Sequence, residues 1–292
     1  MKPTDLTPVE ERNGLLYKRE DAFALEGGVN GSKLRACFHL AEKAKAAGAM
    51  EIVSAASVLS PQSPMAANVA RQLGMSSVTI VGGTTPEKAV KNLSIRLAQE
   101  AGSEILALAP TGYNPALQAA GRRFVAENPG SWQLPYGIST PSDVSDDDLR
   151  DFLLVGAQQV ANLPEGLERL VLPFGSGNTA AGVLYGLAVL GMPSTLKNVT
   201  LMTIGPDKRK WLEERLARLG VRLEDLGVEI EQIHLHPFFA EYGDSMRETL
   251  DGIKLHPTYE GKIARYLNLV EPDWWTARDG KTMLWIVGGP LR

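Results

Sequence analysis

The chain has 292 residues, 44% of them hydrophobic, which is enough apolar material to bury one large core or two modest ones. With 30 basic and 34 acidic residues the net charge is −4, so we expect no general attraction to nucleic acid or to an anionic membrane. No run approaches the roughly 18 uninterrupted apolar residues of a membrane span, and no membrane association is expected. The single cysteine, Cys37, excludes an internal disulfide and favours a reducing, cytoplasmic location.

Helical periods alternate with short apolar or β-branched runs along the chain. In chain order, the first part is predicted to form helix 32–47, strand 51–54, helix 65–73, strand 77–81, helix 86–101, strand 104–108 and helix 115–127. After an acidic, turn-rich connection at 139–148, the second part is predicted to form helix 149–162, strand 169–172, a helix-like run at 183–190, strand 198–204, helix 207–219 and strand 229–235. This alternation is typical of mostly parallel sheets covered by helices. We therefore predict an α/β protein with a small inserted domain at 50–145 and a large domain formed by 1–49 and 146–292.

A glycine-rich turn separates the apolar run 170–174 from the helix-like run. It contains Gly175, Ser176, Gly177, Asn178 and Thr179. Small residues after a strand let the backbone approach an anion, and the N–H groups that open the next helix point at it. The turn has no Gly-Lys-Ser/Thr ending and no full dinucleotide fingerprint, so a single phosphate monoester fits better than a nucleoside triphosphate. The alternative is an ordinary tight turn between a strand and a helix.

A lysine near the start of the chain follows a second glycine-rich loop. Glycines at 27, 28 and 31 precede Ser32, a plausible N-cap, and Lys33 then falls in the first helical turn. The helix dipole disfavours a cation there, which favours the neutral amine. A neutral lysine can form a Schiff base with an aldehyde, and pyridoxal phosphate supplies both an aldehyde and one phosphate. The alternative is a surface lysine after a loop.

Segments along nearly the whole chain resemble the fold-type II pyridoxal-phosphate enzymes, in particular the branch of 1-aminocyclopropane-1-carboxylate deaminase and D-cysteine desulfhydrase. The similar segments are Lys18-Arg19-Glu20-Asp21 with Gly28-Val29-Asn30-Gly31-Ser32-Lys33-Leu34-Arg35, Ser60-Pro61-Gln62-Ser63, Gly175-Ser176-Gly177-Asn178-Thr179 and His256-Pro257-Thr258-Tyr259-Glu260-Gly261-Lys262. The resemblance implies a fold like that of the tryptophan synthase β chain, with two three-layer α/β/α domains of mostly parallel strands. It also implies a homodimer.

The resemblance further implies a role for each matching position. Lys33 would carry the cofactor as an aldimine and shuttle protons, and Glu260 would lie beside the pyridine nitrogen. Ser60 and Tyr259 would act in catalysis. The phosphate would be held by Gly175, Ser176, Gly177, Asn178 and Thr179. The substrate would be bound by Ser60, Gln62 and Ser63.

Two positions depart from the family pattern. Pro61 stands where the family usually has an asparagine that contacts the cofactor ring, and Val287 stands where it has a hydroxyl residue. His234 and His236 have no third ligand nearby in the sequence, so no metal site is predicted.

The predicted function is a pyridoxal-phosphate-dependent enzyme that acts at the α-carbon of a small amino-acid substrate by deamination, elimination or decarboxylation. One alternative is that the amino-acid group is attached to a larger molecule, such as modified DNA. Others are a non-catalytic protein that binds the cofactor or an amino acid, and a phosphosugar or nucleotide binder that uses the glycine turn alone.

Overall fold

The computed structural model describes residues 2–239, 246–289 and 291. Their contacts divide the chain into two compact units. Unit 1 takes the described residues of Met1–Phe23 and Val144–Pro290, and unit 2 takes those of Ala24–Asp143 and Leu291–Arg292. No helix in these described ranges is long and apolar enough to cross a membrane.

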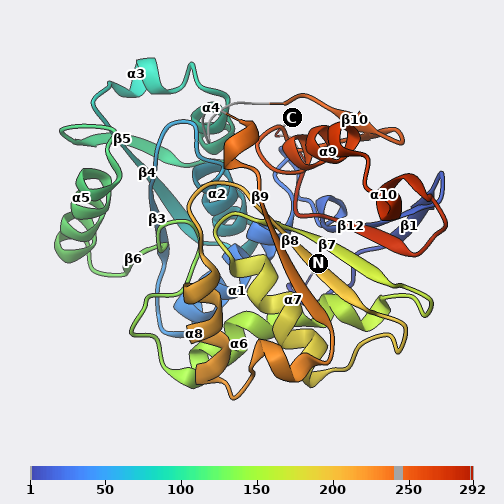
Figure 1. Cartoon of the computed structure of the whole chain (residues 1–292). Helices are drawn as coiled ribbons and strands as arrows, with labels where there is room; N and C mark the ends of the chain where they lie inside the picture. The colour runs from blue at the N-terminus through green and yellow to red at the C-terminus, as the bar shows by residue number, and fades with distance from the viewer. Residues whose placement is uncertain (1, 240–245, 290, 292) are drawn as a thin grey trace. The chain divides into compact units, whose positions relative to one another are not determined.

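Unit 1 is built on a sheet of six strands in its described residues (Figure 1). In spatial order the strands are β1 (Val9–Arg12), β2 (Leu15–Arg19), β12 (Thr282–Ile286), β7 (Arg169–Phe174), β8 (Asn198–Thr203) and β9 (Glu229–His234). Only the β1 and β2 pair is antiparallel, and the other neighbours run parallel. The carboxyl ends of β2, β12, β7, β8 and β9 therefore share one edge of the sheet.

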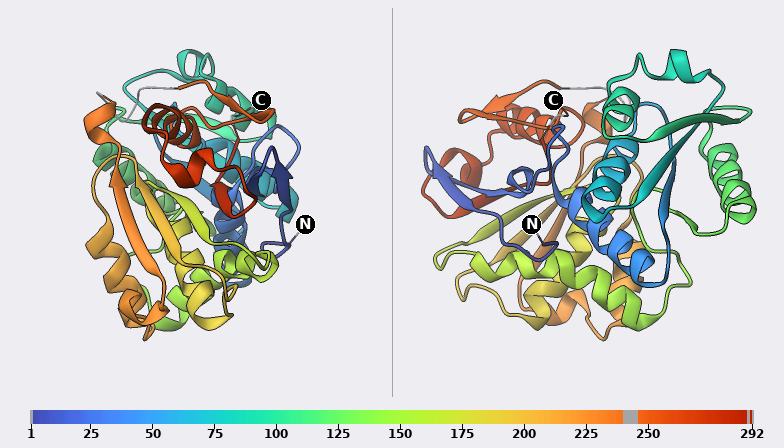
Figure 2. Two further views of the ribbon diagram at one scale, coloured as in Figure 1. Left: turned by 45° about the vertical axis from the view of Figure 1, so that its right-hand side comes forward. Right: turned by 180° about the vertical axis from the view of Figure 1, so that it is seen from behind.

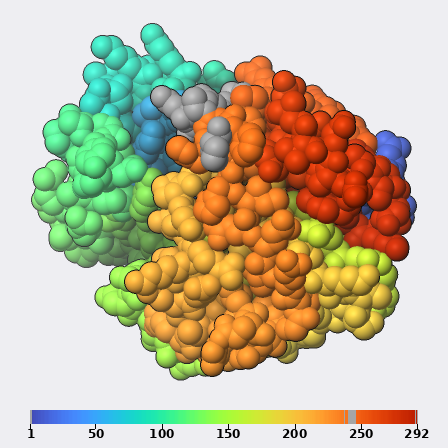
Figure 3. Space-filling model, viewed as in Figure 1, coloured from blue at the N-terminus to red at the C-terminus, as the bar shows by residue number. Residues whose placement is uncertain are grey.

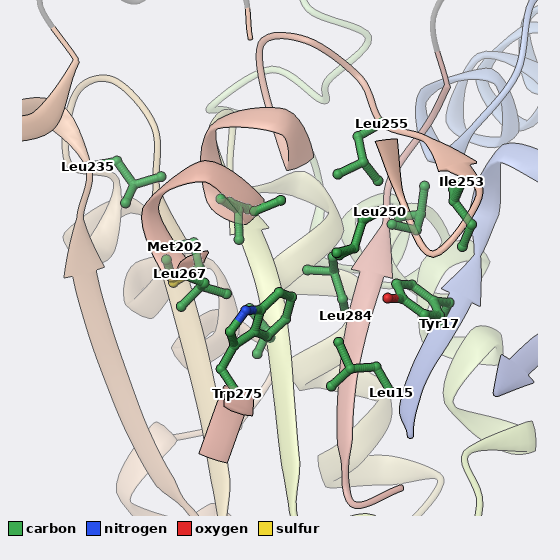
Figure 4. Close-up of a cluster of buried hydrophobic side chains, with 14 of the residues drawn as sticks. Leu15, Tyr17, Met202, Leu235, Leu250, Ile253, Leu255, Leu267, Trp275 and Leu284 are labelled. Atoms are coloured by element: carbon green, nitrogen blue, oxygen red, sulfur yellow. The ribbon is translucent and has the colours of Figure 1, made fainter. Parts of the chain in front are cut away.

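Helices and short segments connect these strands. They are α6 (Asp146–Ala157), α7 (Asn178–Val189), α8 (Arg209–Arg218), α9 (Glu260–Val270) and α10 (Asp273–Thr276), the hairpin of β10 (Thr249–Leu250) and β11 (Ile253–Lys254), and 3-10 turns at Glu20–Ala22, Gln158–Asn162, Leu223–Leu226 and His236–Phe238. Figure 4 shows the core beneath α9, where Leu284 and Tyr17 of the sheet meet Leu267 and Trp275 of α9 and α10. Along β12, Leu284 and Ile286 belong to this core, and the alternate residues Met283 and Trp285 are also buried. Both faces of the sheet are thus covered, as expected for parallel strands.

Unit 2 is a three-layer α/β/α arrangement around four parallel strands (Figure 2). The strand order is β5 (Glu104–Ala109), β4 (Ser76–Gly82), β3 (Glu51–Ala55) and β6 (Ser131–Gln133). On one face α5 (Asn114–Glu127) packs through Leu117 and Ala120. The other face carries α2 (Gln62–Leu73), which contacts α1 (Ser32–Ala46) and α4 (Leu93–Glu100). The outward face of α5, in green, is solvent-facing surface in Figure 3.

The predicted domain division differs from this grouping at one long segment and also at residues 144, 145 and 291. Residues 24–49, assigned to the large domain from sequence, lie in unit 2, because α1 packs against α2. The boundaries of the functional domains stay a proposal.

Several element boundaries also differ from the sequence prediction. The single helix expected at 86–101 is two helices, α3 (Pro86–Ala89) and α4, because Asn92 adopts an extended conformation between them. Helix α6 begins earlier than expected because the Ser145 hydroxyl accepts the N–H of Asp148 at 3.1 Å. Strands β1 and β2 and helices α9 and α10 were not predicted.

Candidate active site

The glycine turn of unit 1 joins the end of β7 to the start of α7. Gly177 has φ +88°, and a Cβ at this position would lie 2.6 Å from Cζ3 of Trp211. Only glycine fits both the backbone conformation and the space. The N-cap residue of α7 is Gly177, which has no side chain to cap the helix. The positive end of this helix can therefore receive an anion, as the sequence predicts.

Tyr259 lies against the same turn. A Cβ on Gly175 would be 3.0 Å from Cε1 of Tyr259, so the glycine makes room for the tyrosine ring. The ring of His256 is 4.8 Å from that of Tyr259, centroid to centroid. Two segments that are more than 80 residues apart in the sequence, the glycine turn and the residues before α9, thus come together in unit 1.

Glu260, the first residue of α9, is completely buried. Its Oε1 accepts the backbone N–H of Val287 at 2.5 Å, just beyond the end of β12. Its Oε2 has no hydrogen-bond partner among the described residues. Burial raises the pKa of the Glu260 carboxyl to about 8, helped by the negative charge of Asp21. A carboxyl group with a free oxygen and a pKa near neutrality is suited to share a proton with a ligand.

Lys33 is the second residue of α1 in unit 2. The residue that precedes the helix is Gly31, with φ +95°, so the prediction of Ser32 as N-cap is wrong and Ser32 is the first helical residue. Lys33 does lie in the first turn, as predicted. Burial lowers the pKa of its amine, and the helix dipole acts in the same direction. Both effects favour the nucleophilic, neutral form.

The loop of unit 2 that carries Ser60 leads into α2. The Ser60 hydroxyl accepts the N–H of Gln62 at 3.2 Å, and Oε1 of Gln62 accepts the N–H of Gly137 at 2.9 Å. Nε2 of Gln62 is buried and has no partner within the described part of the chain. Ser63 is fully buried, and its hydroxyl lies 3.2 Å from that of Ser54. Ser60 and Gln62 therefore retain groups for a ligand, whereas Ser63 bonds inside the unit.

The topology of unit 2 places Lys33 and Ser60 at one edge of the sheet. Helix α1 ends just before β3 begins, so α1 runs back along the strands and its first turn lies toward their carboxyl ends. The Ser60 loop follows the carboxyl end of β3 directly. Ligands of parallel α/β sheets bind at this edge.

The segment at 18–21 has an internal structural role. Nζ of Lys18 donates to the carbonyl of Thr7 at 2.9 Å and to Oδ1 of Asn162 at 2.6 Å. Arg19 forms an ion pair with Asp21 at 2.8 Å. These bonds help to hold unit 1 together. Sequence analysis missed Val287 as the partner of Glu260, and no side-chain signal could have revealed a backbone N–H.

Comparisons with known proteins identify the family of the chain. The O-seryl-dTMP PLP-dependent decarboxylase of Salmonella phage ViI is 30% identical over 347 aligned positions, which cover 98% of this chain and 81% of the relative. The chain belongs to the fold-type II pyridoxal-phosphate-dependent enzymes. Its cofactor is pyridoxal phosphate, and it is an enzyme of the lyase and deaminase type.

Other fold-type II enzymes give a consistent result. A 1-aminocyclopropane-1-carboxylate deaminase of Methylobacterium sp. (strain 4-46) is 27% identical, over 85% of this chain and 78% of the relative. A solved structure of an ACC deaminase homologue superposes with a TM-score of 0.69 at 20% identity, over 98% of this chain and 89% of the other, and shows the same fold. No model of a protein family matches the chain.

The residues of this fold-type II enzyme suit the cofactor. The glycine-capped start of α7 suits a phosphate, Oε2 of Glu260 suits a ring nitrogen, and Lys33 offers an amine with a lowered pKa. Each is a buried or dipolar group that a ligand of this chemistry would satisfy.

Proposed function

We propose that this enzyme removes the carboxylate from an amino-acid group carried by a nucleotide or by nucleic acid. The observation that carries the proposal is the similarity to the O-seryl-dTMP decarboxylase, which extends over 98% of this chain. The substitution of Pro61 for the asparagine usual in the family alters the loop beside Ser60, where a different substrate would be accommodated.

The residues of unit 1 are proposed to hold the cofactor. The backbone N–H groups and hydroxyls of Gly175, Ser176, Gly177, Asn178 and Thr179 would bind its phosphate. Glu260 would contact the pyridine nitrogen through Oε2 and, as a carboxylate beside that nitrogen, would favour its protonated form. Tyr259 would fix the position of the ring from beside Gly175.

Lys33 is proposed to attach the cofactor covalently and then to act on the substrate. When bound, pyridoxal phosphate accepts the electron pair that the breaking bond leaves on the α-carbon. In decarboxylation the bond from the α-carbon to the carboxylate breaks, carbon dioxide leaves, and the α-carbon takes up a proton. The Lys33 amine would deliver that proton once the substrate has displaced it from the cofactor.

Ser60 and Gln62 are proposed to orient the substrate carboxylate. Both are neutral donors, and Nε2 of Gln62 is buried without a protein acceptor among the described residues. Decarboxylation removes the negative charge of the carboxylate, so a strong cationic partner would stabilise the ground state more than the transition state. Neutral donors orient the group without that penalty. Ser63 would support the loop through Ser54.

Deamination of a free amino acid is the second candidate. It is favoured by the Tyr259-Glu260-Gly261-Lys262 segment, which resembles the deaminase branch, and by the 27% identity to a deaminase. The two candidates differ in product, because decarboxylation releases carbon dioxide and deamination releases ammonia.

The test compares the wild-type enzyme with Lys33→Ala, and with Lys45→Ala as a control for an exposed lysine on the same helix. We expect the wild type and the control to show the visible absorbance of a lysine-bound cofactor and to release carbon dioxide from O-seryl-dTMP. Lys33→Ala should lose the absorbance and at least about a thousandfold of the rate. Release of ammonia from L-serine or 1-aminocyclopropane-1-carboxylate, without carbon dioxide from the nucleotide, would replace the first candidate by the second.

We also propose a homodimer and a cytoplasmic location. The family resemblance supports the first, and the single cysteine, Cys37, supports the second. Light scattering of the purified enzyme measures the first, and cell fractionation the second.

A further inference from the structure

Unit 2 contains a cavity of about 310 Å³ that the proposed catalytic residues do not fill. It lies beyond the carboxyl ends of β3, β4 and β5. Ser57 and Val58 line it from the loop after β3, Gly83 and Thr84 from the loop after β4, and Gly112 from the loop after β5. The volume lies within the usual range for small-molecule sites, roughly 300–1,000 Å³. Its first loop is the one that leads to Ser60, so the cavity adjoins the proposed substrate-binding residues along the chain.

Glycines shape the floor of this cavity. A Cβ on Gly82 would lie 2.1 Å from the carbonyl oxygen of Thr111, so the loops after β4 and β5 pack backbone to backbone. Gly83 has φ +64°, and a Cβ there would lie 3.2 Å from the N atom of Gly112. A side chain at Gly82 or Gly83 would force the loops apart. The close packing of these glycine loops therefore determines the shape of the cavity.

All the residues that line the cavity are uncharged, and several carry hydrogen-bonding groups. Nδ2 of Asn92 donates to the carbonyl of Ala89 at 3.1 Å, which leaves Oδ1 of Asn92 available to accept. The Ser57 hydroxyl accepts the N–H of Leu59 at 3.4 Å and can still donate. A phosphate or carboxylate would be costly to bury here without a cation. An uncharged ring with both carbonyl and N–H groups matches the lining.

Large apolar side chains follow the lining residues in the chain and are exposed to solvent. Leu59, next to Val58, is 76% exposed, and Tyr113, next to Gly112, is 72% exposed. Flat aromatic rings stack on such side chains, and stacking on tyrosine is a common way to bind a nucleobase. Leu59 and Tyr113 could therefore stack on an uncharged ring that binds in the cavity beside them.

The segment between Thr84 and Asn92 adds positive charge. Lys88 and Lys91 are exposed, and neither has an ion pair within the described part of the chain. Glu87 is the single acidic residue between Thr84 and Asn92, so the segment carries a net positive charge. An uncharged cavity flanked by free lysines matches a nucleotide, with the base enclosed and the phosphate in solvent.

We propose that this cavity holds the pyrimidine base of a nucleotide-linked amino acid, with the phosphate outside it near Lys88 and Lys91. The proposal rests on the proposed function and names the part of unit 2 that would select the substrate. A pyrimidine dione presents carbonyl acceptors and an N–H donor, which match the donor of Ser57 and the acceptor of Asn92.

The test measures binding of thymidine and of dTMP to the cofactor-loaded enzyme by calorimetry. Gly112→Leu fills the cavity without strain, since the Cβ meets only the Gly82 carbonyl oxygen, at 3.4 Å, and the φ of Gly112 is not positive. Ala126→Leu places the same leucine side chain at an exposed position of α5 and is the control. We expect Gly112→Leu to weaken thymidine binding at least about tenfold, and Ala126→Leu to leave it unchanged.

A second comparison separates the base from the phosphate. Lys88→Ala combined with Lys91→Ala should leave thymidine affinity unchanged and remove the extra affinity for dTMP, together with its dependence on salt. Comparison of dTMP with single-stranded and duplex oligonucleotides identifies the source of the base, because a base in a duplex must first be flipped out. Tighter binding of dTMP indicates a free nucleotide, and tighter binding of an oligonucleotide indicates nucleic acid.

The inference and the proposed function fail in different ways. Absence of thymidine binding to the wild type, or binding that Gly112→Leu does not weaken, overturns the cavity assignment even if O-seryl-dTMP is decarboxylated. Thymidine binding that depends on Gly112, without decarboxylation of O-seryl-dTMP, supports the cavity and overturns the reaction.

Discussion

At the scale of single residues, Glu260 shows how burial prepares a functional group. The protein places its carboxyl out of contact with water; Oε1 accepts the backbone N–H of Val287, and Oε2 has no partner among the described residues. An unpartnered carboxylate oxygen in such a place is unfavourable, so the pKa rises to about 8 and the group retains a proton. A ligand nitrogen at Oε2 would relieve this cost. The buried Glu260 carboxyl thus lowers the stability of the cofactor-free protein at the place where the cofactor is proposed to bind.

The raised pKa of Glu260 predicts how stability depends on pH in the cofactor-free protein. Between the ordinary carboxyl value of 4.5 and about 8, folded Glu260 keeps a proton that the unfolded chain has released. Stability therefore falls as pH rises through this window, by up to roughly 1.4 kcal/mol per pH unit. Urea unfolding at about pH 5 and about pH 8 should show this loss for the wild type, whereas Glu260→Gln, which cannot ionise, should lack it. Equal pH dependence in both proteins would contradict the assignment.

At the scale of elements, helix α7 depends on a glycine at each end for different reasons. Gly177 precedes the helix with φ +88° and lies against Trp211, whereas Gly191 follows it with φ +96° and has open space around its Cβ position. Both need the left-handed conformation. Only Gly177 belongs to the proposed phosphate site. Substitutions at the two positions therefore distinguish the effect of backbone strain from the effect on ligand binding.

Substitution of these two glycines tests the role of the turn. Gly191→Ala should cost about 1–2 kcal/mol of stability from backbone strain, with no change in cofactor affinity. Gly177→Ala should cost more, because its Cβ meets Trp211 at 2.6 Å, and should also weaken binding of pyridoxal phosphate at least about tenfold. Denaturant unfolding and absorbance titration measure the two effects. Unchanged cofactor affinity in Gly177→Ala would remove the phosphate role from this turn.

At the scale of the whole molecule, local sequence patterns determine most strands and helices but not the contacts between distant segments. The alternation of helical and β periods predicted the parallel sheets, and glycine spacing predicted the turn before α7. The break at Asn92 was not predicted because the apolar residues of 86–101 follow a helical spacing throughout the segment. The contact of Tyr259 with Gly175 and the bond from Val287 to Glu260 arise only from folding, because they join residues that are 84 and 27 positions apart.

Cofactor binding should stabilise the whole enzyme by mass action, because the unfolded chain has no assembled site. At a ligand concentration a hundredfold above Kd the gain is about 2.7 kcal/mol, which corresponds to a rise in Tm of roughly 5 °C for a chain of this size. Calorimetry of the cofactor-free enzyme with added pyridoxal phosphate measures the rise in Tm. Pyridoxal, which lacks the phosphate, is the control, and we expect it to raise the Tm less.

Lys33→Ala separates the covalent bond from the phosphate contacts in the same experiment. The phosphate turn remains in this variant, so pyridoxal phosphate should still raise its Tm, by less than in the wild type, while pyridoxal should have almost no effect on it. Equal shifts from both ligands in the wild type would show that the turn at Gly175–Thr179 contributes nothing to binding. Loss of every shift in Lys33→Ala would assign all of the binding energy to the lysine, because the remaining contacts would then be too weak to hold the cofactor on their own.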